Sequence, residues 1–241
     1  MSRQPLRVLA IGAHPDDLEF YCGGTLAKYA ARGDTVVMAV VTNGDIGSAT
    51  HSMEEIAAIR KQEALDSAAM IGAELIWMDY HDEFFFYDES TRRHMIEVIR
   101  YAAPDVVLGH WTDDYHPDHS LSGMAARDAR IMTGVPLIVT ASAYLKKIPT
   151  HFFYDTMAGI NFVPEVYVDV TETFSIKQQM LACHKSQNAW ISDVFEGRSI
   201  AQMMEVQTAF RGLQAGVRYA EGFRALETFP RARDYRLLPL E

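Results

Sequence analysis

The 241-residue chain carries 22 Lys and Arg residues against 32 Asp and Glu residues, a formal charge of −10 at pH 7. A field of that sign repels polyphosphates and anionic membrane surfaces, so neither nucleic acid nor a membrane is an expected partner. The length and the 49% apolar content suit one large α/β domain with a core of its own.

The cysteines and the N-terminal segment bear on the compartment. Cys22 and Cys183 are the only cysteines, too few for a disulfide framework, which favours a reducing compartment. The apolar run 6–13 lacks a basic region of the kind that a signal peptide carries, and no stretch is long enough to span a bilayer. We therefore expect a soluble, cytoplasmic protein.

Short β-branched runs alternate with helical patterns along the first half of the chain. The runs predict buried parallel strands at 8–11, 35–41, 75–78 and 105–108. Apolar residues at three- and four-residue spacing predict helices at 19–31, 53–71 and 91–102, and Gly33, Gly72 and Pro104 stand where these helices should stop. Repeated strand–helix–strand units predict a Rossmann-like, mostly parallel sheet with helices on both faces.

The pattern is less regular after Pro136. We expect a mixed segment at 137–157, a strand at 166–170, a helix from 173 to about 185, and a helical tail to about Tyr219. No linker is evident, so we expect a single domain over 1–241, with a core at 1–135 and a C-terminal strand and helices at 136–241. In such a sheet the active site lies at the carboxyl ends of the strands.

Two clusters of His and Asp follow predicted strands. His14-Pro15-Asp16-Asp17 comes after the first strand, and a second cluster at 113–119 comes after the fourth. A solvated helix start would explain Asp16 and Asp17 if they stood alone, because carboxylates suit a helix N-terminus. The second cluster belongs at the same edge of the sheet, so we expect both to converge on one crevice.

The two clusters contain the ligands that catalytic zinc takes. Three protein ligands leave one position for water, and His14, Asp17 and His119 fill those three places. One carboxylate leaves the site electropositive, so bound zinc would lower the pKa of its water to about 7. Asp16 is then free to take a proton from that water and to deliver it to a leaving nitrogen.

Two residues of the second cluster, His116 and Asp118, are not metal ligands in this assignment. A carboxylate that holds one imidazole nitrogen fixes the tautomer and favours the charged form. We therefore expect the pair to stabilise a developing oxyanion opposite the metal.

These residues give the chain its resemblance to the LmbE/PIG-L family of metal-dependent N-acetylglucosamine-type deacetylases. The resemblance covers most of the chain, with blocks in the family's order at 14–19 with Gly23 and Gly24, at 41–45, at Arg60 with Glu63, at 116–119 and at 184–187. It implies an LmbE-like fold and the same roles: ligands His14, Asp17 and His119, base Asp16, and oxyanion groups His116 and Asp118. It also implies a homo-oligomer.

Two further residues are expected to bind substrate. Arg60 resembles a substrate-contacting arginine, although with Glu63 it could also form an ordinary ion pair on one helix. Asp82 could reach a sugar hydroxyl from the loop after the third strand, or be a plain loop acid. Some relatives place a tyrosine two residues before the histidine that matches His116, where this chain has Asp114, so Tyr115 receives no role.

We expect zinc-dependent hydrolysis of the N-acetyl amide of an N-acetylglucosamine-containing small molecule. Iron(II) or cobalt could replace zinc. Alternatives are an amidase for a non-sugar amide, a non-haem iron enzyme built on two histidines and a carboxylate, and a metal-binding protein without catalysis. A dinucleotide-dependent oxidoreductase is disfavoured, because His-Pro-Asp-Asp and not Gly-x-Gly-x-x-Gly follows the first strand.

Overall fold

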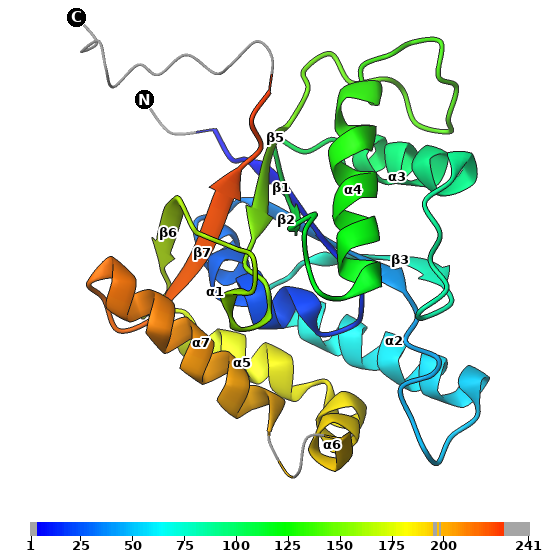
Figure 1. Cartoon of the computed structure of the whole chain (residues 1–241). Helices are drawn as coiled ribbons and strands as arrows, with labels where there is room; N and C mark the ends of the chain where they lie inside the picture. The colour runs from blue at the N-terminus through cyan, green and yellow to red at the C-terminus, as the bar shows by residue number, and fades with distance from the viewer. Residues whose placement is uncertain (1–3, 195–196, 198, 229–241) are drawn as a thin grey trace, which may run out of the picture.

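A computed structural model describes residues 4–194, 197 and 199–228. Within these residues one sheet has the order β3-β2-β1-β4-β5-β7-β6 (Figure 1). β1 to β5 are parallel, and β7 runs antiparallel to β5 and β6. The strands are β1 (Arg7–Gly12), β2 (Thr35–Thr42), β3 (Glu74–Tyr80), β4 (Val106–His110), β5 (Thr150–Tyr154), β6 (Val166–Asp169) and β7 (Ala220–Ala225).

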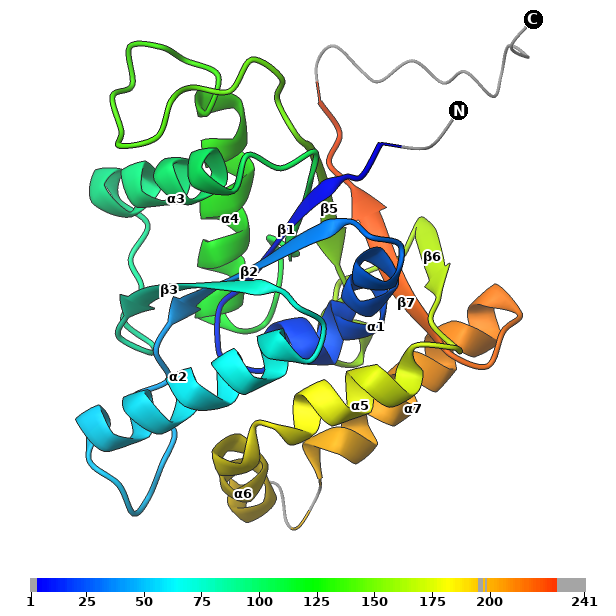
Figure 2. The same cartoon turned by 180° about the vertical axis from the view of Figure 1, so that it is seen from behind.

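Helices cover both faces of the sheet (Figures 1 and 2). One face carries α1 (Asp17–Ala31), α2 (Met53–Ala69), α5 (Phe174–Ala182) and α7 (Ile200–Ala215), and the other carries α3 (Glu89–Ala102) and α4 (Pro117–Met132). A short helix η1 (Met157–Gly159) and α6 (Lys185–Val194) complete the set described. None of the helices in the described ranges is long and apolar enough to cross a membrane.

Alternation along β1 explains why the sheet has a core on each side. Val8 and Ala10 pack into the core beneath α1, while Leu9 and Ile11 pack into the core beneath α3 and α4. A strand that is buried on both faces is apolar throughout, as the sequence of β1 is. The predicted α/β fold, with a mostly parallel sheet covered on both faces, is confirmed.

The second half of the chain differs from the prediction in its strands. One strand was expected after residue 136, and the described part of this half has three, β5, β6 and β7. β7 has the sequence Ala-Glu-Gly-Phe-Arg-Ala, with no β-branched residue. It is a strand because it pairs with β5 and β6, a long-range contact that local propensity does not report.

Three helical predictions also change. The helix expected at 173–185 breaks at Cys183 and His184 into α5 and α6, and the tail expected to Tyr219 ends at Ala215, before Gly216 with a φ of +74°. α4, which follows the second His/Asp cluster, was not predicted. It begins at Pro117, whose fixed φ suits the first position of a helix.

Sheet order places the two predicted clusters side by side. β1 lies between β2 and β4, and the chain moves outward from β1 in one direction through β2 and β3 and in the other through β4 and β5. The segments after β1 and β4 therefore diverge, which opens a crevice at the carboxyl ends of these strands.

Candidate active site

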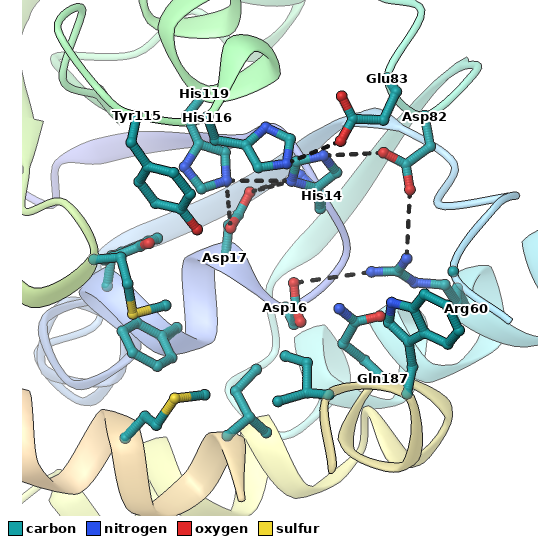
Figure 3. A pocket seen from close by; sticks show the side chains of 18 of the residues that line it. His14, Asp16, Asp17, Arg60, Asp82, Glu83, Tyr115, His116, His119 and Gln187 are labelled. Carbon is teal, nitrogen blue, oxygen red and sulfur yellow. Dashed lines mark hydrogen bonds and ion pairs between the residues drawn. The ribbon is translucent and has the colours of Figure 1, made fainter. Parts of the chain in front are cut away.

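A cavity of about 590 Å³ lies at this crevice (Figure 3). The structure gathers all the predicted site residues around it. Asp118 lies behind the wall, and the cavity is lined by the other seven, His14, Asp16, Asp17, Arg60, Asp82, His116 and His119.

The turn between β1 and α1 is unusual. Asp16 is the N-cap of α1, yet it has a φ of +124° and its side chain makes no capping hydrogen bond. An N-cap aspartate ordinarily accepts a backbone N–H of the first turn. Here the carboxylate does not cap the helix and instead lines the cavity, so a helix start does not account for Asp16.

His14, Asp17 and His119 point toward one another. Nδ1 of His14 lies 3.3 Å from Nε2 of His119 and 3.4 Å from Asp17 Oδ2, and Nε2 of His119 lies 3.3 Å from Asp17 Oδ1. Ligands bound tetrahedrally at about 2.0–2.1 Å from zinc are separated by roughly 3.3–3.4 Å. The two imidazole nitrogens have this separation, and Asp17 presents one carboxylate oxygen to each of them, so the three side chains lie close enough together to share a metal ion.

The outward nitrogens of both imidazoles face carboxylates. Nδ1 of His119 lies 3.2 Å from Asp114 Oδ2, and Nε2 of His14 lies 3.1 Å from Asp82 Oδ1 and 3.5 Å from Asp118 Oδ2. A carboxylate on the outer nitrogen orients a metal-binding histidine and raises its basicity. This outer layer is what a metal site requires, and the sequence alone did not predict it.

The charges also favour a cation. Burial lowers the pKa of His14, but hydrogen bonds to Asp118, Asp17 and Asp82 outweigh it and raise the pKa well above its ordinary value. Burial likewise lowers the pKa of His119, and the charge of Asp17 contributes to raising it to about 9. The carboxylates therefore stabilise positive charge at the position where the three ligand atoms meet.

Asp16 stands outside the ligand triangle. Its Oδ1 lies 3.9 Å from Nη2 of Arg60, and the residue is only 6% exposed. Burial raises the pKa of Asp16 to about 7, against the opposing charge of Arg60. A carboxyl group with a pKa near neutrality can both accept and return a proton.

Arg60 is held by the backbone of two loops. Its Nη1 donates to the carbonyl of Gly44 at 3.3 Å, its Nη2 donates to the carbonyl of Pro15 at 3.0 Å, and Nη1 lies 3.8 Å from Asp82 Oδ2. Gly44 has a φ of +66°, and a Cβ there would lie 2.3 Å from Arg60 Nη1. The glycine of the Thr-Asn-Gly-Asp block is therefore required both by its backbone angle and by the guanidinium beside it.

The partner of His116 is not the expected one. Nδ1 of His116 accepts the backbone N–H of Asp118 at 3.3 Å, and its Nε2 lies 3.2 Å from Glu83 Oε1. The carboxylate of Asp118 lies instead beside His14 and accepts the backbone N–H of Glu83 at 2.9 Å. Glu83 has a φ of +64° in the loop after β3, and no sequence signal distinguished it.

His110 is a further member of the site. It ends β4, lies 3.1 Å from Asp17 Oδ2, and stacks on His119 with ring centroids 4.1 Å apart. Burial lowers its pKa to about 4, so the ring is neutral at physiological pH. Its place at the end of a predicted strand was the available signal.

Contacts between the family's sequence blocks hold α6 beside the cavity. Glu63 accepts hydrogen bonds from the backbone N–H and the hydroxyl of Ser186 in α6, at 2.9 and 2.6 Å. One interpretation of the sequence had paired Glu63 with Arg60, and the structure pairs it with Ser186 instead. Nε2 of His184 lies 3.2 Å from Glu19 Oε1. These contacts explain physically why residues so far apart in the sequence belong to one pattern.

The aromatic residues divide between core and surface. Phe85 is 1% exposed and packs in the core, whereas Phe84 and Phe86 are 60% and 65% exposed. Tyr115 lines the cavity and is 55% exposed, with its ring 6.0 Å from that of His116.

Comparison with known proteins agrees with this geometry. Residues 9–130 match the profile of the family PIG-L, GlcNAc-PI de-N-acetylase. Diacetylchitobiose deacetylase of Thermococcus kodakarensis is 29% identical over 90% of this chain and 82% of its own length. The structure of N,N'-diacetylchitobiose deacetylase from Pyrococcus horikoshii superimposes with a TM-score of 0.79 and 28% identity, over 91% of this chain and 83% of that one.

One relative has a different reaction in its name. 4-Oxalmesaconate hydratase of Pseudomonas putida is 23% identical over 74% of this chain and 73% of its own length. Similarity to proteins of this family therefore does not by itself determine which bond is broken.

Proposed function

Because the chain belongs to the PIG-L family of GlcNAc-PI de-N-acetylases, we propose that it hydrolyses the N-acetyl amide of an N-acetylglucosamine-containing small molecule. Water adds to the acetyl carbonyl, the C–N bond breaks, and acetate and the free amine are released. The observation that carries the proposal is the uncapped carboxylate of Asp16 beside the triangle of His14, Asp17 and His119.

The metal that we assign to the triangle is zinc, held by His14, Asp17 and His119. When bound there, zinc supplies a Lewis acid and lowers the pKa of water to about 7. The same nitrogen and oxygen ligands accept iron(II) and cobalt, so the metal is tested separately below.

Asp16 moves the proton in this reaction. It takes a proton from the attacking water and delivers it to the amide nitrogen, which leaves as a neutral amine because an amide anion is a very poor leaving group. Arg60 positions Asp16, since the guanidinium is 2% exposed, is anchored on two carbonyls, and lies 3.9 Å from the carboxylate.

His116 is suited to hold the developing oxyanion. Its Nδ1 accepts the backbone N–H of Asp118, so the ring hydrogen of a neutral imidazole is on Nε2. That N–H faces Glu83 Oε1 at 3.2 Å, and it can donate to an oxyanion that takes the place of this carboxylate. We infer that Glu83 holds His116 in place before the oxyanion forms, and that Asp82 and Asp118 support His14.

A hydratase acting on a carboxylate substrate is disfavoured by the charges of the cavity. Asp16, Asp17, Asp82 and Glu83 line it, and Arg60 is the one Lys or Arg among the described lining residues. Arg60 is itself 3.8 and 3.9 Å from two of these carboxylates. These carboxylates repel a substrate that carries several carboxylates, and a bound dication would offset only part of that repulsion, whereas a neutral acetamide is not repelled.

The test is acetate release from N-acetylglucosamine and a panel of its conjugates. The protein is stripped with a chelator and reconstituted with zinc, iron(II) or cobalt in turn. We expect metal-dependent release that is largest with zinc. Release from simple acyl amides but from none of the sugars would indicate a non-sugar amidase. Bound metal without any release would indicate a binding protein or another reaction.

A further inference from the structure

The cavity has two chemically different sides. Figure 3 shows the labelled polar groups together on one side and unlabelled side chains of carbon and sulfur on the other, next to the yellow and orange helices. Apolar lining residues are Phe20, Met157, Ile160, Ile200 and Met203. Four of these lie outside residues 9–130, the range that matches the family profile.

Two isoleucines that line the cavity are exposed to solvent. Ile160 is 44% exposed, and Ile46, which also lines the cavity, is 41% exposed. Both side chains leave apolar area in water within a cavity of ligand-binding size. Covering such area strengthens binding by about fourfold for each methylene group that is buried.

The apolar side continues into a second groove. Met157 and Met203 line the first cavity and also a groove of about 610 Å³ along α7, where Val206 is 70% exposed and Phe210 is 51% exposed. Met203, Val206 and Phe210 are spaced by three and four residues, so they share one face of the helix. Seven residues of helix extend about 10 Å, which gives the length of the apolar path beyond the cavity.

We propose that the substrate is an N-acetylglucosaminide with an apolar aglycone, aryl or alkyl, that lies against Met157, Ile160 and Met203 and extends toward Phe210. The inference rests on the proposed function, which requires the acetamide to lie at the polar side beside Asp16. The rest of the molecule then meets the apolar side. A second sugar there would place hydroxyl groups against Met157, Ile160 and Met203, whose side chains do not donate to them, which is unfavourable.

The experiment measures kcat/KM for deacetylation of methyl, hexyl and phenyl N-acetylglucosaminides and of N,N'-diacetylchitobiose, with the metal-loaded enzyme. We expect the hexyl and phenyl glycosides to exceed both the methyl glycoside and the disaccharide by at least about tenfold. The disaccharide controls for size, since it is larger than the methyl glycoside and polar. In Met203→Gln the ratio of kcat/KM for the hexyl glycoside to kcat/KM for the methyl glycoside should fall at least threefold. Leu213→Gln, an exposed change on α7 outside both lining sets, should leave the ratio unchanged.

The outcomes separate this inference from the proposed function. Equal kcat/KM values across the four compounds, or a preference for the disaccharide, would overturn the apolar aglycone and leave deacetylation standing. Cleavage of none of them would overturn both. A third outcome would assign the groove to a second copy of the chain and reject the proposal. In that case Phe210→Glu converts an oligomer to a monomer, as measured by light scattering, and neither Phe210→Glu nor Met203→Gln changes the ratio of kcat/KM for the hexyl glycoside to that for the methyl glycoside.

Discussion

Asp16 shows how one backbone angle separates two adjacent carboxylates. With a φ of +124°, Asp16 occupies a conformation that residues other than glycine rarely adopt. Asp17, the first residue of α1, then points to His14 and His119, while the Asp16 side chain lines the cavity without a capping bond. Strain of this kind, which costs about 1–3 kcal/mol, persists where the surrounding structure enforces it.

The separation predicts opposite effects for the two aspartates. Asp16→Asn should lower kcat by about 10²–10⁴-fold, because an amide cannot accept the proton, while the metal content stays near that of the wild type. Asp17→Asn should lose metal, because a charged ligand is removed. Elemental analysis and acetate release on the same samples check both. Loss of metal from Asp16→Asn would mean that the ligand and the base have been interchanged.

The contacts of Asp118 and Glu83 give a second pair of predictions. Asp118→Asn should weaken metal affinity by about 10–100-fold, since Asp118 lies beside the proposed ligand His14. Glu83→Gln should retain metal affinity, because His116 is the one imidazole that Glu83 contacts at hydrogen-bond distance. It should lower kcat by about tenfold, which is less than the effect of removing an oxyanion donor itself. Competition with a chromophoric chelator measures the affinity. The reverse pattern would restore the Asp118–His116 pairing expected from the sequence.

At this scale the sequence predicted which residues gather but not all of their pairings. His14, Asp17 and His119 follow from residue type and from position after a strand. Asp114 and Glu83 did not, because their contacts depend on how the loops after β3 and β4 fold over the strand ends. Loop conformation is a product of tertiary packing, and a single sequence contains little local signal for it.

At the scale of elements, three strand ends are joined through the loop after β2. Thr42 donates its hydroxyl to the carbonyl of Ala13 at 2.9 Å, and Asp45 accepts the backbone N–H of Asp82 at 3.1 Å. The loop therefore contacts the segments after β1 and β3. Gly44 lies at its centre against Arg60.

Gly44→Ala should affect both stability and activity. The added methyl group meets the buried guanidinium at a φ of +66°, so we expect a loss of about 1–3 kcal/mol of unfolding free energy and a large fall in kcat. Gly33→Ala is the matched control, because Gly33 has a φ of +79° and no atom within 4 Å of the added carbon. Urea unfolding and acetate release should show that the control loses stability only. Equal effects of both changes on kcat would remove the role assigned to Gly44.

Helices and strands could be predicted where their buried positions are all apolar. β1 and β2 are buried on both faces and read as continuous apolar runs. β7 and α4 were missed, since Glu221 of β7 and His119 of α4 are buried polar residues that interrupt the apolar pattern. Glu221 accepts the N–H groups of Gly24 and Thr25 and pairs with Lys177, and that contact is formed only in the folded chain.

At the scale of the whole molecule, one sheet joins the two halves of the sequence through the pairing of β4 with β5. His151 of β5 is 2% exposed, and neither ring nitrogen has a hydrogen-bond partner among the described residues. Burial lowers its pKa to about 3, with Arg130 and Arg127 contributing. The folded protein therefore resists protonation at this position.

This histidine predicts a pH dependence of stability. Its pKa is lower in the folded than in the unfolded chain, so the unfolded chain binds the extra proton between about pH 6.5 and 3 and is favoured as pH falls. The unfolding free energy of His151→Leu minus that of the wild type should grow by about 1.4 kcal/mol per pH unit from pH 6 to pH 4. Denaturant titrations at several pH values measure this difference. A difference that does not vary with pH would show that the folded protein accommodates the charged ring.

The sheet order has a consequence for how such an enzyme can change its specificity. The proposed metal ligands and the proposed base lie at the ends of β1 and β4, whereas most of the apolar side of the cavity comes from η1 and α7, which follow β5. If the apolar side binds the aglycone as proposed, reactivity and selectivity are encoded in separate stretches of the gene. Mutations in the later stretch can adapt the enzyme to a new conjugate while the hydrolytic centre is inherited unchanged.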